Sequence, residues 1–101
     1  MEDKAALIFD WNEKDRRGPL LRRTPRFVDE TIRDGLQSPS VRDPSIEQKM
    51  EVLRLMDRLG IQVVNLGLPA AGERAYADVE RLARCIVEEK LSIRPNCAAR
   101  T

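Results

Sequence analysis

A short run of charged and amide side chains gives the clearest chemical signal in the chain. Residues 29–37 read Asp-Glu-Thr-Ile-Arg-Asp-Gly-Leu-Gln and follow the apolar pair Phe27-Val28. The carboxylate of Asp34 can bind a hard cation, and the neighbouring guanidinium of Arg33 can bind a substrate carboxylate or a developing oxyanion. The amide of Gln37 adds a hydrogen-bonding group. The run therefore predicts a charged site that follows a short apolar segment.

Composition limits the functions that such a site can serve. The 101 residues carry 18 basic and 17 acidic side chains, a net charge of +1, and only four aromatic residues (one Trp, one Tyr and two Phe). This balance gives no reason to expect nucleic acid or an anionic membrane as a partner. No apolar run approaches the roughly 20 residues that cross a bilayer. The acidic N-terminus, Met-Glu-Asp-Lys, does not resemble a signal or transit peptide, so we expect a cytoplasmic protein.

The cysteines and the absence of histidine limit metal chemistry. Cys85 and Cys97 lie too far apart for a CxxC motif, and the chain contains no histidine. Two cysteines without histidine cannot form a four-ligand zinc site. In a reducing cytosol we interpret both thiols as small packed residues and not as a disulfide.

The first half of the chain divides into an extension and the beginning of a folded domain. Residues 1–25 are interrupted by Gly18-Pro19 and Pro25, which predicts an N-terminal extension. Residues 26–29 favour a short buried parallel strand, and a loop should occupy about residues 31–44. A helix should follow, with a capping box at residues 45–48 and a stop at Gly60. Its apolar positions recur at helical spacing: Ile46, Met50, Leu53, Met56 and Leu59.

The second half repeats this alternation. Residues 61–66 predict a strand, residues 67–72 a loop, residues 73–90 a helix and residues 91–96 a third strand. The apolar face of the second helix comprises Ala75, Val79, Leu82 and Ile86. The alternation predicts an α/β fold with right-handed β-α-β units and a parallel sheet of three strands and two helices.

Polar residues follow each predicted strand. Arg33 and Asp34 follow the first strand, Asn65 ends the second, and Asn96 and Arg100 follow the third. The carboxyl ends of parallel strands lie at one edge, where α/β proteins gather their functional groups. We therefore expect these side chains to converge on one rim.

The first-strand motif resembles the signature of the DRE-TIM metallolyases, the family that includes isopropylmalate synthase, homocitrate synthase and hydroxymethylglutaryl-CoA lyase. Six of nine positions match the signature: Asp29, Thr31, Arg33, Asp34, Gly35 and Gln37. The resemblance covers about residues 26–101 and includes the Leu59-Gly60 stop and the Gly67-x-Pro69 turn. It implies that this region is the N-terminal part of a TIM (β/α)8 barrel of the pyruvate-carboxyltransferase type.

The resemblance also implies a role for each site residue. Asp34 would be a ligand of a divalent metal (Mg, Mn or Zn), and Arg33 would stabilise an enolate or oxyanion. Gln37, Asn65 and Arg100 would contact the substrate, whereas Asp29 and Thr31 would brace the strand end and Gly35 would permit the turn. The implied activity is a transferase reaction of amino-acid biosynthesis that condenses acetyl-CoA with a 2-oxo acid, in an enzyme that we expect to be a homo-oligomer.

Two features leave alternatives open. Asn65 stands where family members often carry glutamate, which leaves the identity of the substrate open. Residues 34–37 are also compatible with a carbon–carbon lyase of the hydroxymethylglutaryl-CoA type. Between the two activities we favour the synthase. The family's remaining metal ligands are a His-x-His pair that this chain lacks. We therefore expect a fragment with an incomplete metal site that is inactive alone, because a whole barrel takes about 250 residues. A third interpretation is a non-catalytic α/β module that pairs through its open sheet edge.

Overall fold

The computed structural model describes residues 24–99, so the predicted extension, except for Thr24 and Pro25, lies outside the described residues. The chain begins with β1 (Val28–Asp29), the short 3-10 helix η2 (Gly35–Gln37) and α1 (Ile46–Leu59). It continues with β2 (Val63–Asn65), the 3-10 helix η3 (Pro69–Ala71), α2 (Glu73–Glu88) and β3 (Arg94–Asn96). The predicted order of three strands and two helices is confirmed.

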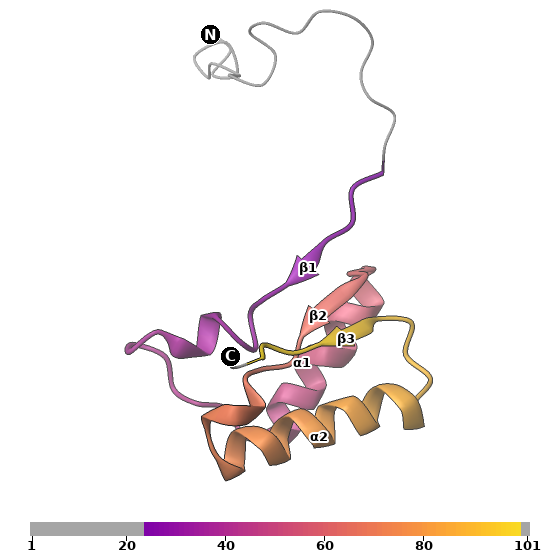
Figure 1. The fold of residues 1–101 in the computed structure, drawn as a ribbon. Coiled ribbons are helices and arrows are strands. Elements are labelled where there is room, and N and C mark those ends of the chain that lie inside the picture. The colour runs from indigo at the N-terminus through magenta and orange to yellow at the C-terminus, as the bar shows by residue number, and fades with distance from the viewer. Residues whose placement is uncertain (1–23, 100–101) are drawn as a thin grey trace, which may run out of the picture.

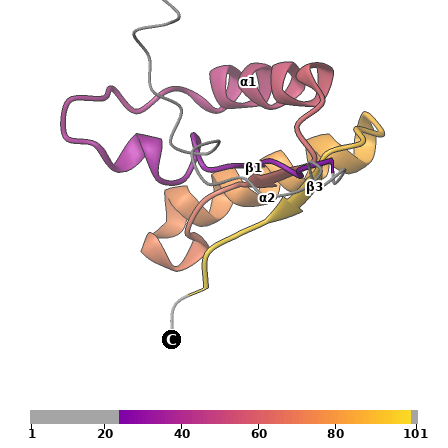
Figure 2. The same ribbon diagram turned by 90° about the horizontal axis from the view of Figure 1, so that it is seen from above.

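The three strands form one parallel sheet in the order β1-β2-β3. Val28 pairs with Val63, and Val63 with Arg94, whereas Asn65 pairs with Asn96. Successive right-handed connections place both helices on the same side of such a sheet. Figure 1 shows α1 and α2 behind and below the strands, and Figure 2 shows the same layers from above. The α/β class is confirmed, and the arrangement is that of the opening of a (β/α)8 barrel.

Local signals fix the ends of α1. The Ser45 side chain accepts a hydrogen bond from the Gln48 N–H, and the Gln48 side chain accepts one from the Ser45 N–H, which completes the predicted capping box. Gly60 ends the helix at φ 92°, a left-handed conformation that glycine adopts without a steric cost. One predicted core position is wrong: Leu59 is exposed. It occupies the last turn, beyond the part of α1 that α2 and the sheet cover.

The core lies between the helices and the sheet. Leu53 from α1, Leu82 from α2 and Val64 from β2 are completely buried. The remaining members of the core come from all parts of the described chain: Ile32, Met50, Met56, Leu66, Cys85, Ile86 and Ile93. Burial on this scale, at roughly 25 cal/mol per Å² of apolar surface, is what holds α1 and α2 against the strands.

The burial predicted for the first strand is wrong. Val28 is 51% exposed, and Phe27 is exposed as well. β1 is an edge strand, and within residues 24–99 only β2 pairs with it. Its apolar side chains therefore lack the second neighbour that covers a strand in the middle of a parallel sheet.

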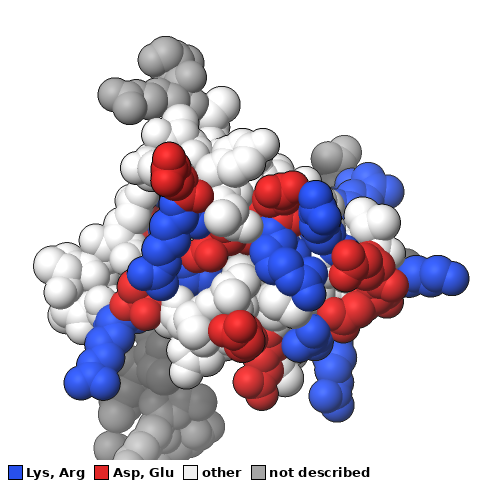
Figure 3. All heavy atoms as spheres, turned by 90° about the horizontal axis from the view of Figure 1, so that it is seen from below, with Lys and Arg blue, Asp and Glu red and all other residues white. Residues whose placement is uncertain are grey.

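The charged surface agrees with the balanced composition. Figure 3 shows basic and acidic side chains interspersed over one face of the molecule. One exposed ion pair of the described chain is Arg84–Glu80, whose Nη2 and Oε1 atoms are 2.7 Å apart. In the described part of the chain, no helix is long and apolar enough to cross a membrane.

Candidate functional site

The backbone of the charged motif forms a series of tight turns directly after β1. The Thr31 N–H donates to Asp29 Oδ1 over 2.8 Å, so Asp29 braces the strand end as expected. The Asp34 N–H then donates to the Glu30 carbonyl over 2.7 Å, and η2 follows at Gly35. These turns hold Arg33 and Asp34 at the carboxyl end of β1.

Gly35 does not have the role that we expected for it. Its φ is not positive, and a Cβ atom built at this position would meet Thr31 Cγ2 at 3.7 Å, an ordinary van der Waals distance. The turn at residue 35 is a 3-10 turn, which other residues also adopt. A glycine is required instead at Gly67, which lines the cavity described below and has a φ of 142° and a Cβ position only 3.1 Å from Val79 Cγ2.

Arg33 and Asp34 form an ion pair at the surface of the site. Arg33 Nη1 lies 3.1 Å from Asp34 Oδ1, and the two side chains are 33% and 68% exposed. The Arg33 Nε atom is buried and has no hydrogen-bond partner. A buried donor without a partner is destabilising, so an acceptor atom within reach of this N–H would stabilise the arrangement. The carboxylate of Asp34 meanwhile faces solvent.

Asn65 ends β2 in a buried position. Its Oδ1 accepts a hydrogen bond from the Gly67 N–H over 3.1 Å. Because only the amide oxygen can accept, this bond fixes the orientation of the amide. Asn65 therefore offers the two hydrogens of Nδ2 as donors, a role that a glutamate at this position could not fill.

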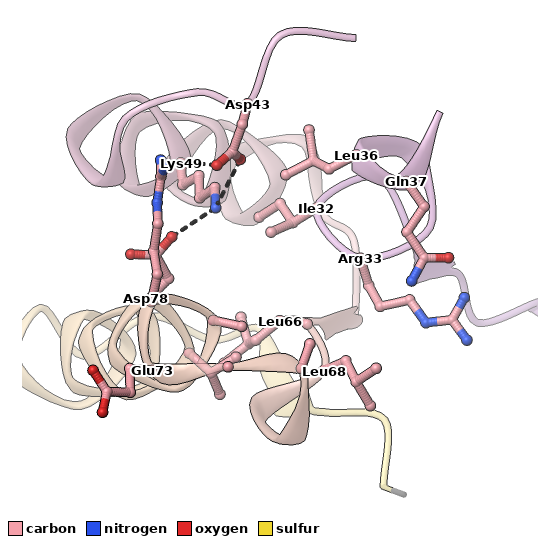
Figure 4. A pocket seen from close by; sticks show the side chains of 16 residues that line it. Ile32, Arg33, Leu36, Gln37, Asp43, Lys49, Leu66, Leu68, Glu73 and Asp78 are labelled. Atoms are coloured by element: carbon pink, nitrogen blue, oxygen red, sulfur yellow. Dashed lines mark hydrogen bonds and ion pairs between the residues drawn. The ribbon is translucent and has the colours of Figure 1, made fainter. Parts of the chain in front are cut away.

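A cavity of about 450 Å³ lies between the β1–α1 loop and the start of α2. Figure 4 shows Arg33 and Gln37 close together at one end of this cavity. Between them and the opposite end lie apolar side chains, including Ile32, Leu36 and Leu66. The structure thus brings together two of the predicted site residues, Arg33 and Gln37.

The other predicted site residues are placed differently. Asp34 forms an ion pair with Arg33, which lines the cavity. Neither Asp34 nor Asn65 lines the cavity itself. Arg100 lies outside the described residues. Arg33, Asp34 and Gln37 are near one another because they lie within five residues of the sequence, and the predicted convergence of residues from separate strands stays a prediction.

The other end of the cavity holds an ion-pair network that sequence reasoning missed. Lys49 Nζ lies 2.7 Å from Asp78 Oδ2 and 3.3 Å from Asp43 Oδ1, and Asp43 also pairs with Arg74 at 2.8 Å. The Lys49 side chain is only 10% exposed. It joins α1 to α2 and to the loop that follows the motif. The sequence does contain a signal for the burial of Lys49, because this residue lies three positions after Ile46 and four before Leu53, within the apolar stripe of α1.

A second network joins the distal parts of the two helices, away from the site. Arg54 donates from Nε and Nη2 to the two carboxylate oxygens of Glu89, each over 2.8 Å, and the Cys85 thiol donates to Glu89 Oε2 over 2.9 Å. The hydrogen bonds from Arg54 are the main cause that lowers the pKa of Glu89 to about 2. Burial is the main cause that raises the pKa of the Cys85 thiol. Cys85 is packed as predicted, but the prediction is wrong for Cys97, which is exposed after β3.

The described residues supply at most part of a metal site. Among residues 24–99 no group of three or more Asp, Glu, Cys or His side chains could hold a metal ion. Asp34 offers a solvent-facing carboxylate, which suits a hard divalent cation as one ligand among several.

Comparisons with known proteins match most of the chain to one family. The family described as HMGL-like matches residues 24–101. The 2-isopropylmalate synthases of Bacillus thuringiensis (strain Al Hakam), Bacillus cereus (strain AH820) and Bacillus anthracis (strain CDC 684 / NRRL 3495) are each 42% identical to the chain over 60 residues. These matches cover 59% of this chain and 12% of each relative, so the chain spans a small part of the length of its curated relatives. No solved structure matches the chain significantly.

Proposed function

Because the chain belongs to the HMGL-like family, a group of DRE-TIM metallolyases, we propose that the protein containing it is a metal-dependent acyltransferase. The reaction would condense acetyl-CoA with a 2-oxo acid, as in isopropylmalate synthase. Support comes from the 42% identity to enzymes named 2-isopropylmalate synthase. We further propose that the enzyme is cytoplasmic and homo-oligomeric, and that residues 24–101 alone are inactive.

The observation that carries this proposal is the unpartnered Nε–H of Arg33. Carbon–carbon bond formation between a thioester enolate and a ketone places negative charge on oxygen. The guanidinium of Arg33 has a buried donor without a partner and an Nη1 atom that is held by Asp34. Such a fixed cationic donor stabilises a developing oxyanion without reorganising during the reaction. Arg33 is therefore the catalytic residue in this proposal.

The neighbouring residues would bind substrate and metal. Asp34 would supply one metal ligand, because its carboxylate is largely exposed to solvent. A divalent metal held there supplies a Lewis acid for the carbonyl group of the 2-oxo acid. Gln37 shares the cavity wall with Arg33 and would orient the substrate, and Asn65 would donate from Nδ2 to a substrate oxygen. We assign Arg100 to substrate binding on the resemblance alone.

The test uses the longest natural polypeptide that contains this sequence. Release of free CoA thiol from acetyl-CoA is followed with a panel of 2-oxo acids, and cleavage of 3-hydroxyacyl-CoA is followed in parallel. We expect thiol release only with a 2-oxo acid and a divalent metal. Arg33→Gln should lower kcat about 10²–10³-fold, the typical effect of losing an oxyanion donor. Asp34→Asn should raise the metal concentration that gives half-maximal rate.

The control is Arg58→Gln, which removes an exposed arginine from the last turn of α1 and should leave both parameters unchanged. If the enzyme cleaves a 3-hydroxyacyl-CoA and does not condense acetyl-CoA with a 2-oxo acid, the assignment as an acyltransferase is wrong and the lyase is correct. An Arg33→Gln variant with the kcat of the unmodified enzyme would contradict the role of Arg33.

The open edges of the sheet support a second candidate, a non-catalytic module. Within residues 24–99 both β1 and β3 have one unpaired edge, and unpaired strand edges favour association with another chain. A natural polypeptide without condensing or cleaving activity that forms a stable dimer by sedimentation equilibrium would favour this candidate. A monomer would exclude it.

A further inference from the structure

A separate cavity lies at the end of the sheet opposite to Arg33 and Asp34. It has a volume of about 320 Å³ and is lined by Arg26, which precedes β1, by the beginning of β2, and by Ser92 and Arg94 at the beginning of β3. Because the strands are parallel, their amino ends lie at the same edge of the sheet. The cavity therefore lies at the edge away from the motif, and none of the proposed catalytic residues lines it.

Two arginines on either side of β2 reach this cavity. Arg94 is in register with Val63 and Val28, and Arg26 precedes Val28 by two residues. Strands lie about 4.8 Å apart, so the backbones of β1 and β3 are about 10 Å apart across β2. Arginine side chains are long enough to bring two guanidinium groups to one molecule over this distance. Both arginines are exposed, and neither forms an ion pair with another residue of the range 24–99.

Side-chain hydrogen bonds fix the backbone next to each arginine. Gln62 Oε1 accepts a hydrogen bond from the N–H of Phe27, the residue after Arg26, over 2.8 Å. Asp57 Oδ1 accepts from the N–H groups of the two residues before Arg94, over 2.8 and 2.9 Å. Gln62 and Asp57 both line the same cavity. The two arginines therefore extend from fixed points, which lowers the entropic cost of bringing them to one ligand.

The charge of the cavity favours an anion. Asp57 is the one acidic side chain among the described residues that line it, against Arg26 and Arg94. One oxygen of Asp57 already accepts two backbone N–H groups. The lining thus carries a net positive charge, with two planar guanidinium groups that can each bind an oxyanion through two parallel hydrogen bonds.

We propose that this cavity binds a doubly charged oxyanion of the phosphate type between Arg26 and Arg94. A phosphate group has enough oxygen atoms to accept from both guanidinium groups at once, whereas chloride cannot be bound in this bidentate manner. The site uses no residue of the proposed acyltransferase centre, so the two proposals stand or fall separately.

The test is a titration of the full 101-residue chain with inorganic phosphate at constant ionic strength. The side-chain Nε–Hε signals of the arginines are followed by ¹H–¹⁵N NMR, and parallel titrations use acetate and chloride. We expect saturable shifts with phosphate for Arg26 and Arg94 only. Arg26→Gln and Arg94→Gln should each raise the phosphate dissociation constant at least about 10-fold, since each removes one bidentate contact.

A matched control is Arg42→Gln, which removes an exposed arginine from the β1–α1 loop and should change the dissociation constant less than about twofold. Arg26→Lys and Arg94→Lys keep the charge but lose the fork of the guanidinium group, and should give intermediate affinities. Far-UV circular dichroism verifies that each variant is folded, and the lysine variants test the site if a glutamine variant unfolds.

Three results would overturn the proposal. Equal weakening by Arg42→Gln would indicate general charge screening and not a site. Loss of affinity in only one of the two arginine variants would reduce the site to a single surface contact. Binding of acetate or chloride as tight as that of phosphate would exclude selection for a doubly charged oxyanion.

Discussion

Replacing Lys49 by methionine tests whether the buried ion-pair network holds the two helices together next to the motif. Lys49 Nζ lies 2.7 Å from Asp78 Oδ2, and the two side chains are 10% and 16% exposed. Methionine has a similar length and no charge, so it fills the space of the lysine stem without a large cavity. The change then removes the cation and leaves the carboxylate of Asp78 without its partner.

The magnitude follows from the burial of the groups that remain. Removing one member of a buried ion pair costs about 3–5 kcal/mol, because the other charge is left uncompensated. Both side chains retain some contact with water, so we expect Lys49→Met to lower the free energy of unfolding by about 3 kcal/mol. Asp78→Asn should cost less, about 2 kcal/mol, because Lys49 keeps Asp43 at 3.3 Å.

The double variant gives the sharper result. If the pair acts as a unit, Lys49→Met with Asp78→Asn should cost about 3 kcal/mol and not the sum of about 5, a coupling of about 2 kcal/mol. Urea unfolding followed by far-UV circular dichroism measures each free energy, with unchanged m values. The control, Arg84→Gln, breaks the exposed pair with Glu80 and should cost less than about 0.5 kcal/mol. Additive effects in the double variant, or a Lys49→Met cost below about 1 kcal/mol, would refute this reasoning.

Three other predictions use signals in separate parts of the chain. Ser45→Ala removes the side-chain acceptor of the α1 capping box, so we expect the free energy of unfolding in urea to fall by about 1 kcal/mol; an unchanged value would contradict the cap. The pKa of Glu89 is about 2 in the folded chain against an ordinary value of 4.5, mainly because Arg54 binds its ionised form. Its stabilising contribution is therefore complete above pH 4.5 and is lost as the pH falls from 4.5 to about 2. Unfolding free energies measured across this range should show a weaker pH dependence for Glu89→Gln, and an identical dependence would argue against the pairing. Exposed Cys97 should react with a chromogenic disulfide reagent at once, whereas buried Cys85 should react only at the rate at which the chain opens; equal rates would show that Cys85 is accessible.

Features that depend on neighbouring residues in the sequence could be predicted. The start of α1 at the capping box and its end at Gly60 follow from hydrogen bonds and dihedral angles within a few residues. The apolar spacing of α1 and α2 predicted five of the ten buried core residues, including Leu53 and Leu82, because helical periodicity decides which residues of one helix share a face. The alternation of strands and helices then predicted the parallel sheet.

Burial at the edges could not be predicted in this way. Val28 and Leu59 are as apolar as the buried residues, but they are exposed because the described chain places no element against them. Cys97 is exposed for the same reason, after the last strand of the sheet. Burial depends on which elements pack together, and periodicity within one element does not contain that information.

The sequence by itself determined the chemical character of the site: a carboxylate, a guanidinium and an amide within a few residues after a short strand, at Arg33, Asp34 and Gln37. The tertiary structure decided how these groups are available. It buried the Nε–H of Arg33 without a partner and turned the amide of Asn65 into a donor. It also joined Lys49 to Asp78, which lies 29 residues away in the sequence. These contacts exist only after the core has brought α1, α2 and the strands together, since no local pattern fixes the distance between groups on separate elements.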